Sequence, residues 1–518
     1  MYLDLVMLVA TFGLICLGFP VAFTLGGAAL AFALLGGVTG DFNMRFLDFL
    51  PSRLYGLMVR DVLVAVPLFV FMGVMLERSR IAEDLLVGLG RLFRSAPGGL
   101  SISVTIVGAL LAASTGIVGA TVVTMGLLSL PSMLRHGYDP QLACGSICAA
   151  GTLGQIIPPS IVLVLLGDFM GSAHQEAQME QGIMAANTVS VGDLFAGALL
   201  PGLLLVGLYI AYQIAVARLQ PHRCPPIRDD EGTPPPTIGQ LLGVLAAPMA
   251  LIIAVLGSIL GGLATPTEAA SVGAVGATLL AGFRIAKFGR WMILVGAIAL
   301  GVLAVMGAVM DLRVGRDTVT GAEDTGIWVA TGLGIIGAIG TVQAFLVTWR
   351  ANVLTPVVLS AARLTGMIFT IVIGATLFTL VFRGLGGDET VHATLHAMPG
   401  GMVGAVGLVM LCMFLMGFFL DFVEITLLVV PIVAPILLVM GVDPVWLGVM
   451  MAMNLQTSFL TPPFGFALFY LRGVAPAEVR TSQIYRGAVP FIGLQVVGLG
   501  LVALFPGIAT WLPNLLFG

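Results

Sequence analysis

The amino-acid sequence predicts an all-α protein that crosses a lipid bilayer many times. Of its 518 residues, 58% are hydrophobic and only 9% are charged, whereas charged residues make up about a quarter of an ordinary globular chain. The mean hydropathy is +1.09. Apolar runs of roughly 20 residues recur from one end to the other, which is the length that a helix needs to span a bilayer. A net charge of −4 gives no reason to expect a nucleic-acid partner.

The expected spans divide the chain into two halves. No Lys or Arg precedes Arg45, so the N-terminal apolar run is read as the first span rather than as a secretory signal. Residues 218–240 are rich in proline and charge and predict an exposed linker between 1–217 and 241–518. The expected spans are 3–19, 21–38, 61–76, 139–171, 193–216, 239–260, 266–283, 290–310, 326–347, 364–382, 443–471 and 487–512, besides two longer apolar regions, 99–134 and 399–440, with a central interruption.

Loop charges predict the orientation of the chain. Arginines cluster in the loops near residues 78–94, 218–228, 284–290 and 472–486, whereas 172–192 has no Lys or Arg. Placing the Arg-rich loops inside puts both termini outside, if each interrupted region enters and leaves from one side. Arg45, Arg53 and Arg60 then lie outside, and we expect them on an amphipathic helix that lies on the membrane surface.

The two halves of the chain carry the same motifs at a constant offset. RHGYDP followed by GTLGQIIPPS in the first half corresponds, without a gap, to VMGVDP followed by NLQTSFLTPP 304 residues later. The loop charges place the turn at 135–137 inside and the equivalent turn at 441–443 outside, so the repeats are inverted. Inverted repeats whose corresponding spans are broken by Gly or Pro are the sequence signature of a secondary transporter. The sequence therefore predicts an inverted-repeat, ion-transporter-like fold.

Each double proline is expected to open a membrane helix. Proline removes a backbone donor, and a freed backbone group survives in hydrocarbon only where it is buried in protein or lines a watery cavity. Opened carbonyls suit a cation, and helix N-termini suit an anion. A plain proline kink is the alternative interpretation. The neutral oxygens available for a hard cation such as sodium are those of Thr152 and Gln155 in the first break, and of Asn454, Gln456, Thr457, Ser458 and Thr461 in the second.

The interrupted regions 99–134 and 399–440 predict two re-entrant helical hairpins. The tip of the first is small and polar, and includes Ser114, Thr115, Gly116, Gly119 and Thr121. The tip of the second contains the carboxylates Asp421 and Glu424. An intramembrane carboxylate is costly and indicates ion or substrate binding, although a buried structural hydrogen bond is the other interpretation.

A shorter motif, ATPTEAA at 264–270, predicts the start of a helix. Thr265 and Glu268 are spaced as a capping box, with proline at the first helical position. We therefore expect these two residues to form a structural cap.

Together these motifs resemble the large membrane subunit of TRAP (tripartite ATP-independent periplasmic) transporters. The resemblance covers nearly the whole chain, and it rests on STGIVGATVVTMG with LPSMLRHGYDP, GTLGQIIPPS, ATPTEAA, FLDFVEIT with PIVAPI, the segment around NLQTSFLTPPFG, and VPFI with FPGIATWLP. It implies a multi-pass protein of the bacterial inner membrane, with a transport domain that moves as an elevator past a scaffold. It also implies Na+ as the coupling ion, a small membrane subunit, a periplasmic binding protein and an organic-acid substrate.

The resemblance also implies residue roles. One sodium ion is expected between the first tip (Ser114, Gly116, Gly119) and the break at Thr152 and Gly154. A second is expected between Asp421 and the residues Asn454, Thr457 and Thr461. Substrate is expected between the tips, beside Thr115, Thr121, Pro158, Pro159, Pro462 and Pro463.

Two features depart from the family pattern. The stretch GIVGATVV lacks the Asp that many relatives have after the first tip, and 290–347 forms an additional apolar pair. A stand-alone ion-coupled carboxylate carrier, which needs no binding protein, is the alternative function. An enzyme is not expected, because the sequence contains neither an HExxH motif nor a nucleotide-binding P-loop.

Overall fold

The computed structural model describes residues 3–79, 81–93, 95–116, 118–183, 188–226, 238–313 and 321–518, and within them it is helical without a strand. The first half comprises α1 (Leu3–Cys16), α2 (Val21–Thr39), η1 (Met44–Phe49), α3 (Leu50–Met58), α4 (Asp61–Arg78), α5 (Ile81–Leu92), α6 (Gly99–Thr115), α7 (Val118–Arg135), α8 (Pro140–Thr152), η2 (Leu153–Gln155), α9 (Ile161–Glu180), α10 (Val191–Leu219) and η3 (Pro221–Arg223). The second half comprises α11 (Ile238–Leu260), α12 (Pro266–Ile285), α13 (Arg290–Val309), α14 (Gly321–Arg350), α15 (Leu354–Gly384), α16 (Gly387–His396), α17 (Met402–Met416), α18 (Phe422–Val439), α19 (Pro444–Leu460), α20 (Phe466–Val474), α21 (Thr481–Leu504) and α22 (Gly507–Phe517).

The helical membrane fold expected from composition is confirmed. Among the described residues, nine helices are long and apolar enough to cross a membrane. Boundaries differ from the sequence prediction most at three places. α15 begins at Leu354, whereas the expected span began at residue 364. The span expected to end at residue 171 continues in α9 to Glu180, and the apolar run 487–512 forms two helices, α21 and α22, on either side of Pro506. Proline has no backbone N–H to donate, so α21 ends before Pro506 and a new helix begins after it.

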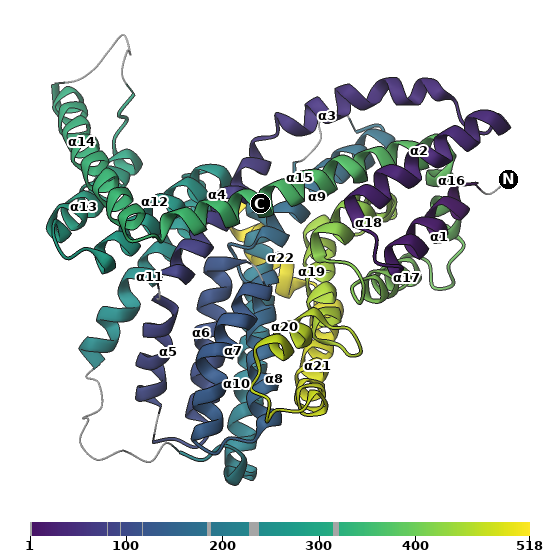
Figure 1. Ribbon diagram of the computed structural model, residues 1–518. Helices are drawn as coiled ribbons and strands as arrows, with labels where there is room; N and C mark the ends of the chain where they lie inside the picture. Colours follow the sequence, from purple (N-terminus) through teal and green to yellow (C-terminus); the bar gives the residue numbers. More distant parts are fainter. Residues whose placement is uncertain are drawn as a thin grey trace.

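The segment with Arg45 and Arg53 forms a separate helical arm. η1 and α3 together are bent by 53° from α4. Positions 53, 54, 57 and 60 follow a helical spacing. Leu54, Leu57 and Arg60 are partly buried, and Arg53 is exposed. The arm therefore packs one face on the protein, and it lies across the top of the molecule in Figure 1.

The sequence repeat is also a repeat of local structure. Asp139 and Asp443 each cap the helix that follows, accepting a hydrogen bond of 2.8 Å from a backbone N–H of its first turn. Gly137 and Gly441, two residues earlier, have φ of +77° and +94°. These are left-handed conformations that end α7 and α18 and that a side chain would disfavour. In both repeats a hairpin of two helices therefore leads into a capped helix that is later interrupted.

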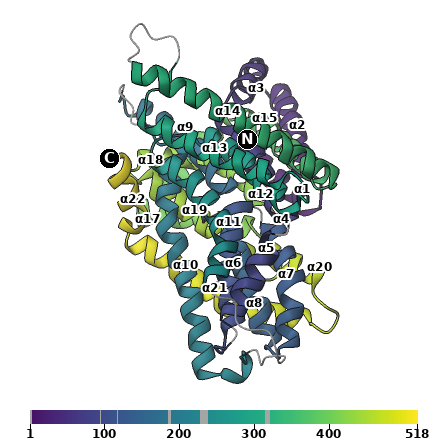
Figure 2. The ribbon, with the colours of Figure 1, turned by 90° about the vertical axis from the view of Figure 1, so that its left-hand side faces the viewer.

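The helices form two groups. In the first group, α15 packs on α2 and α4, and α12 packs on α4, α11 and α14. In the second group, α8 packs on α6, α7 and α21, while α18 packs on α9 and α10 packs on α22. The pair α13 and α14 protrudes at one end (Figure 1), and Figure 2 shows the long helix α10 alongside α6. Contacts between the groups include those of α4 with α6 and α9, and of α15 with α18.

Glycine allows α8 and α21 to approach at backbone distance. A Cβ at Gly145 would overlap the carbonyl group of Gly487, and one at Gly487 would overlap the carbonyl of Gln141. Small residues of this kind are typical of helix pairs that pack tightly within membranes.

We therefore expect Gly145→Ala to destabilise the protein by about 1–3 kcal/mol, because the added methyl group forces the two helices apart. The thermal unfolding midpoint of the purified protein measures the effect. Gly493→Ala on α21 is the matched control, because a Cβ there meets nothing within 4 Å. Equal midpoints for the two variants would contradict the role of Gly145.

Candidate functional site

The first break separates α8 and η2 from α9. Residues 156–160 continue without helical structure, the peptide bond between Pro158 and Pro159 is cis, and every residue of the segment is buried. The hydrogen bonds of the described chain include none to the carbonyls of residues 156–159. Among the described residues, these four consecutive carbonyls thus have no donor, and they lie in a buried segment where an unpaired backbone group is costly. A bound cation would satisfy them.

The second break is closed by more hydrogen bonds and is less buried. The N–H of Thr461 donates to the Ser458 carbonyl at 3.0 Å, and the N–H of Gly465 donates to the Thr461 carbonyl at 3.1 Å. The Tyr485 hydroxyl donates to the Pro463 carbonyl at 3.0 Å. The bond between the two prolines is again cis, but Pro463 is exposed. The two breaks therefore share a backbone plan and differ in their surroundings.

The two interrupted helices meet at Thr152. Its Oγ1 accepts hydrogen bonds from Nε2 of Gln456 at 3.5 Å and from Nε2 of Gln495 at 3.3 Å, and it donates to the Ala149 carbonyl at 2.9 Å. Thr152 and Gln456 occupy equivalent positions of the two repeats, 304 residues apart. Equivalent residues of two repeats touch only beside the axis that relates the repeats, so the predicted breaks lie at the centre of the repeat unit.

Several buried polar groups around this contact have no partner in the described chain. They include both amide atoms of Gln155, the amide oxygens of Gln456 and Gln495, and the Tyr209 hydroxyl. The Tyr209 hydroxyl faces Gln495, Gln456 and Thr152 without a hydrogen bond of ordinary geometry. An unsatisfied buried polar group costs about 1–3 kcal/mol, so these groups suit an ion or ordered water. Sequence reasoning missed Tyr209 and Gln495, although a lone Gln in an apolar span is itself a signal.

The tip of the first hairpin lies between α6 and α7. Gly116 has φ of +60°, and a Cβ there would lie 3.2 Å from the Ile161 nitrogen at the start of α9. Gly119 faces the Tyr470 ring on α20, and Thr121 is buried. The side chains of Ser114 and Thr115, at the end of α6, lie outside the described residues. The structure thus brings the predicted glycines of this tip against both interrupted helices.

The tip of the second hairpin ends in a capping box. Asp421 accepts from the Phe422 N–H at 2.8 Å, and Glu424 accepts from the Asp421 N–H at 3.0 Å. A Cβ at Gly417 would overlap the Ser458 hydroxyl, so this tip packs tightly on α19. Both carboxylates therefore have a structural role, and cation binding by Asp421 stays a prediction.

The other predicted residues of the second break have hydrogen bonds that leave lone pairs unused. Asn454 donates through Nδ2 to the Met410 carbonyl at 2.7 Å, which ties α19 to α17. The hydroxyls of Thr457 and Thr461 donate to carbonyls of their own helix at 2.8 Å and 2.7 Å. Because each hydroxyl proton points along the helix, the oxygen lone pairs stay available to a cation. In the first break, Gly154 lies buried in η2.

Thr265 and Glu268 form a capping box at the start of α12. The Thr265 N–H donates to Glu268 Oε2 at 2.8 Å, and the Glu268 N–H donates to Thr265 Oγ1 at 3.3 Å. α12 packs on α4 rather than on either break. The pair therefore starts a helix at a distance from the candidate site.

Replacing Thr152 with Val tests the contact between the repeats. Thr152→Val keeps the shape but removes the oxygen that accepts from Gln456 and Gln495, so we expect a loss of about 1–3 kcal/mol of stability. Thr331→Val is the control, because that exposed hydroxyl donates only to its own helix, to the Ile327 carbonyl at 2.8 Å. Thermal unfolding of both variants measures the difference. A Thr152→Val protein no less stable than the control would argue against the contact.

Two hairpins and two interrupted helices in a multi-pass membrane protein are the architecture of a secondary transporter. Residues 8–508 match the family described as "Tripartite ATP-independent periplasmic transporter, DctM component". The chain therefore belongs to this family, as its motifs predict, and it is a multi-pass protein of the bacterial inner membrane. Its relatives are transporter permeases rather than enzymes.

The relatives align along almost the whole chain. The C4-dicarboxylate TRAP transporter large permease protein DctM of Vibrio cholerae is 28% identical over 98% of this chain and 96% of its own length. The ectoine TRAP transporter large permease protein TeaC of Halomonas elongata is 24% identical over 99% of both chains. Among solved structures, the YdaH transporter of Alcanivorax borkumensis has a TM-score of 0.54 at 16% identity, covering 90% of this chain and 88% of that one. This last likeness concerns the fold alone.

Proposed function

We propose that this chain imports a small organic acid, delivered by a periplasmic binding protein, with the sodium gradient as the driving force. The observation that carries the proposal is the first break, where a buried segment contains four carbonyls, and the nearby amide of Gln155, that have no hydrogen-bond partner among the described residues. Oxygen ligands without net charge suit a hard monovalent cation, and the hairpin tip at Gly116 packs against the same segment.

The two proposed sodium sites follow the two breaks. The first comprises Thr152 and Gly154 with the first hairpin tip, at Ser114, Gly116 and Gly119. The second comprises Asn454, Thr457 and Thr461 with Asp421. Broken helices at corresponding positions of two repeats provide carbonyls and helix C-termini for coupling ions.

The substrate class is supported by the relatives. Their names specify C4-dicarboxylates, isethionate, ectoines and sialic acid, most of which carry an acidic group. The proposed site lies between the hairpin tips, beside Thr115, Thr121 and the four prolines of the breaks. Neither tip contains Lys or Arg, so the N–H groups at helix N-termini are the donors that would face the acidic group.

The two groups of helices support movement of one past the other. The hairpins and interrupted helices all belong to the group with α6–α10 and α17–α22, and the other group contains α2, α4, α12 and α15. We assign the group that contains the hairpins and interrupted helices to an elevator-like transport domain, and the group that contains α2, α4, α12 and α15 to the scaffold. A small membrane subunit completes the proposed assembly, and one relative, the permease protein DctMQ, is a longer chain of which this one covers 63%.

Sodium is expected to stabilise the purified chain. A ligand at about 100 times its Kd raises the free energy of unfolding by roughly 2.7 kcal/mol, so the thermal midpoint should be higher in sodium chloride than in potassium or choline chloride. Asn454→Leu should reduce the sodium-specific increase by the contribution of the second site, because it removes an oxygen from that site and leaves the first site intact. Val497→Leu on an exposed position of α21 is a control that should keep it. Equal midpoints in all three salts would count against preformed sodium sites.

Uptake is expected to need all three components. Proteoliposomes with this chain, the small subunit and the binding protein should accumulate an organic acid when sodium is outside, and should fail when any protein or the sodium gradient is omitted. Accumulation by this chain alone would instead support the stand-alone carrier. Accumulation driven by a proton gradient without sodium would refute sodium coupling.

A further inference from the structure

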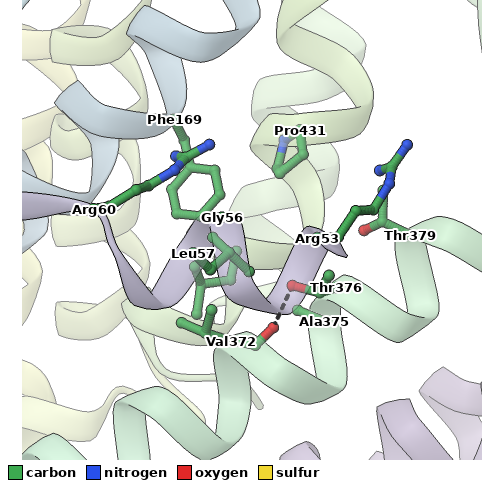
Figure 3. A pocket seen from close by; sticks show the side chains of 11 residues that line it. Arg53, Gly56, Leu57, Arg60, Phe169, Val372, Ala375, Thr376, Thr379 and Pro431 are labelled. Atoms are coloured by element: carbon green, nitrogen blue, oxygen red, sulfur yellow. Dashed lines mark hydrogen bonds between the residues drawn. The ribbon is translucent and has the colours of Figure 1, made fainter. Parts of the chain in front are cut away.

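A cavity of about 300 Å³ lies between the two groups of helices. Its walls come from α3 and α15 on one side and from α9 and α18 on the other (Figure 3). We name it the seam cavity. The loop charges predict that Arg53 and Arg60, which line it, lie on the outer side of the membrane. It is separate from both breaks, since none of its lining residues belongs to them.

Two arginines lie at opposite ends of the seam cavity. Figure 3 shows Arg53 and Arg60 with Gly56 and Leu57 between them. Arg60 Nη1 pairs with Asp168 Oδ2 on α9 at 2.7 Å. Among the described residues, Arg53 has no salt bridge or hydrogen bond, although it lies near enough to Asp388 on α16 for its charge to act on that carboxylate. The cavity thus contains one paired and one unpaired guanidinium and no unpaired acid.

The remaining walls suit the carbon skeleton of a small organic molecule. Phe169, Leu427 and Pro431 supply apolar surface, and Thr376 and Thr379 supply hydroxyls. The Thr376 hydroxyl donates to the Val372 carbonyl at 2.7 Å, a bond that is drawn in Figure 3. Small-molecule sites combine apolar walls with a few charged groups in this way, and the volume is at the low end of their range.

A second cavity beyond Arg383 has the opposite charge. Its walls include Glu176, Glu180, Asp388 and Glu389. Arg383 pairs with Glu176 at 2.8 Å and donates to the Pro431 carbonyl at 3.0 Å, so it lies between the two cavities. An anion is therefore attracted to the seam cavity, which is lined by Arg53 and Arg60, and repelled from the acidic cavity beyond Arg383.

We propose that the seam cavity binds a small organic dianion, with one acidic group on Arg53 and the other on Arg60. Arg53 belongs to α3, whereas Arg60 lies beyond the end of α3 at its junction with α4, so the two guanidinium groups stand at opposite ends of the cavity. A single carboxylate does not span that separation, whereas a short dicarboxylate reached by two long side chains does. Guanidinium groups form bidentate hydrogen bonds with carboxylates, which gives the site its preference.

Binding there would replace Asp168 as the partner of Arg60. Asp168 belongs to α9 of the group with the interrupted helices, and Arg60 stands at the junction of α3 and α4 in the other group. A dianion in the seam cavity would therefore release one ion pair that links the two groups. This inference rests on the proposed function for its physiological ligand: the site would hold the organic acid before it reaches the breaks.

Succinate binding in the absence of sodium tests the proposal. The full chain in phosphatidylcholine nanodiscs, in choline chloride, should bind radiolabelled succinate, and butyrate should compete poorly because it has one carboxylate. Arg53→Gln and Arg60→Gln should each weaken succinate binding by about tenfold or more, a change of about 1.4 kcal/mol, since each removes a charge-assisted pair. Asp168→Asn should tighten binding, because Arg60 then has no competing partner.

Arg45→Gln is the matched control, because Arg45 is exposed on η1 and does not line the seam cavity. Unchanged affinity in both Arg53→Gln and Arg60→Gln, equal affinity for succinate and butyrate, or no binding would each overturn the proposal. Phosphatidylglycerol in the nanodisc tests a lipid as the occupant of the cavity. If this lipid abolishes succinate binding to the unmodified chain, and the Arg53→Gln variant binds succinate in the same nanodiscs, the cavity is a lipid headgroup site and the proposal fails.

The test is independent of sodium coupling. Arg53→Gln should retain the sodium-dependent increase in thermal midpoint, because neither break includes Arg53. If sodium does not raise the thermal midpoint of the unmodified chain but succinate still binds, the proposed function alone is refuted. A sodium effect without succinate binding would refute the seam site alone.

Discussion

The structure depends on one constraint, which is that backbone polar groups in a membrane interior need partners within the protein. Nearly all of this chain meets the constraint with helices, but two spans are opened by double prolines. Around the first opening, the surrounding helices bury residues 156–160, and four of their carbonyls have no donor among the described residues. The hairpin tip at Gly116 lies against that opening because glycine permits the close approach. Packing and polarity at the centre of the molecule thus follow from the broken backbone.

The two repeats use one backbone plan in unequal surroundings. Equivalent aspartates cap α8 and α19, and equivalent residues meet at Thr152 and Gln456. Nevertheless the first break is buried, while Pro463 of the second is exposed and its carbonyl accepts from Tyr485. Only the second tip carries carboxylates, and these cap α18. Two sites built on such different surroundings would differ in affinity and in access, although they share a sequence register.

The sequence was sufficient to predict features that depend on local chemistry or on the repeat. These include the apolar spans, the two openings and the cap at Thr265. It was insufficient where distant segments decide. The gathering of Gln495 and Tyr209 around Thr152 depends on packing between helices far apart in the chain. The division between α21 and α22, in contrast, follows from the local effect of Pro506. A hydropathy pattern reports whether a residue is apolar, and it carries no information about which distant residue it meets.

Contacts within each group of helices differ in kind from contacts between the groups. Within the groups, backbones touch at glycine, as Gly145 does on α21 and Gly374 on α2, and such packing permits little sliding. Between them, α9 is held by ion pairs to Arg60 and Arg383, whose side chains are 34% and 21% exposed. Partly exposed ion pairs contribute about 0–1 kcal/mol each, so they align two bodies without fixing them. Apolar contacts of α4 with α6 and α9, and of α15 with α18, also join the groups. The proposed movement between the groups would leave the glycine contacts within each group intact, and this difference is the physical argument for placing the movement there.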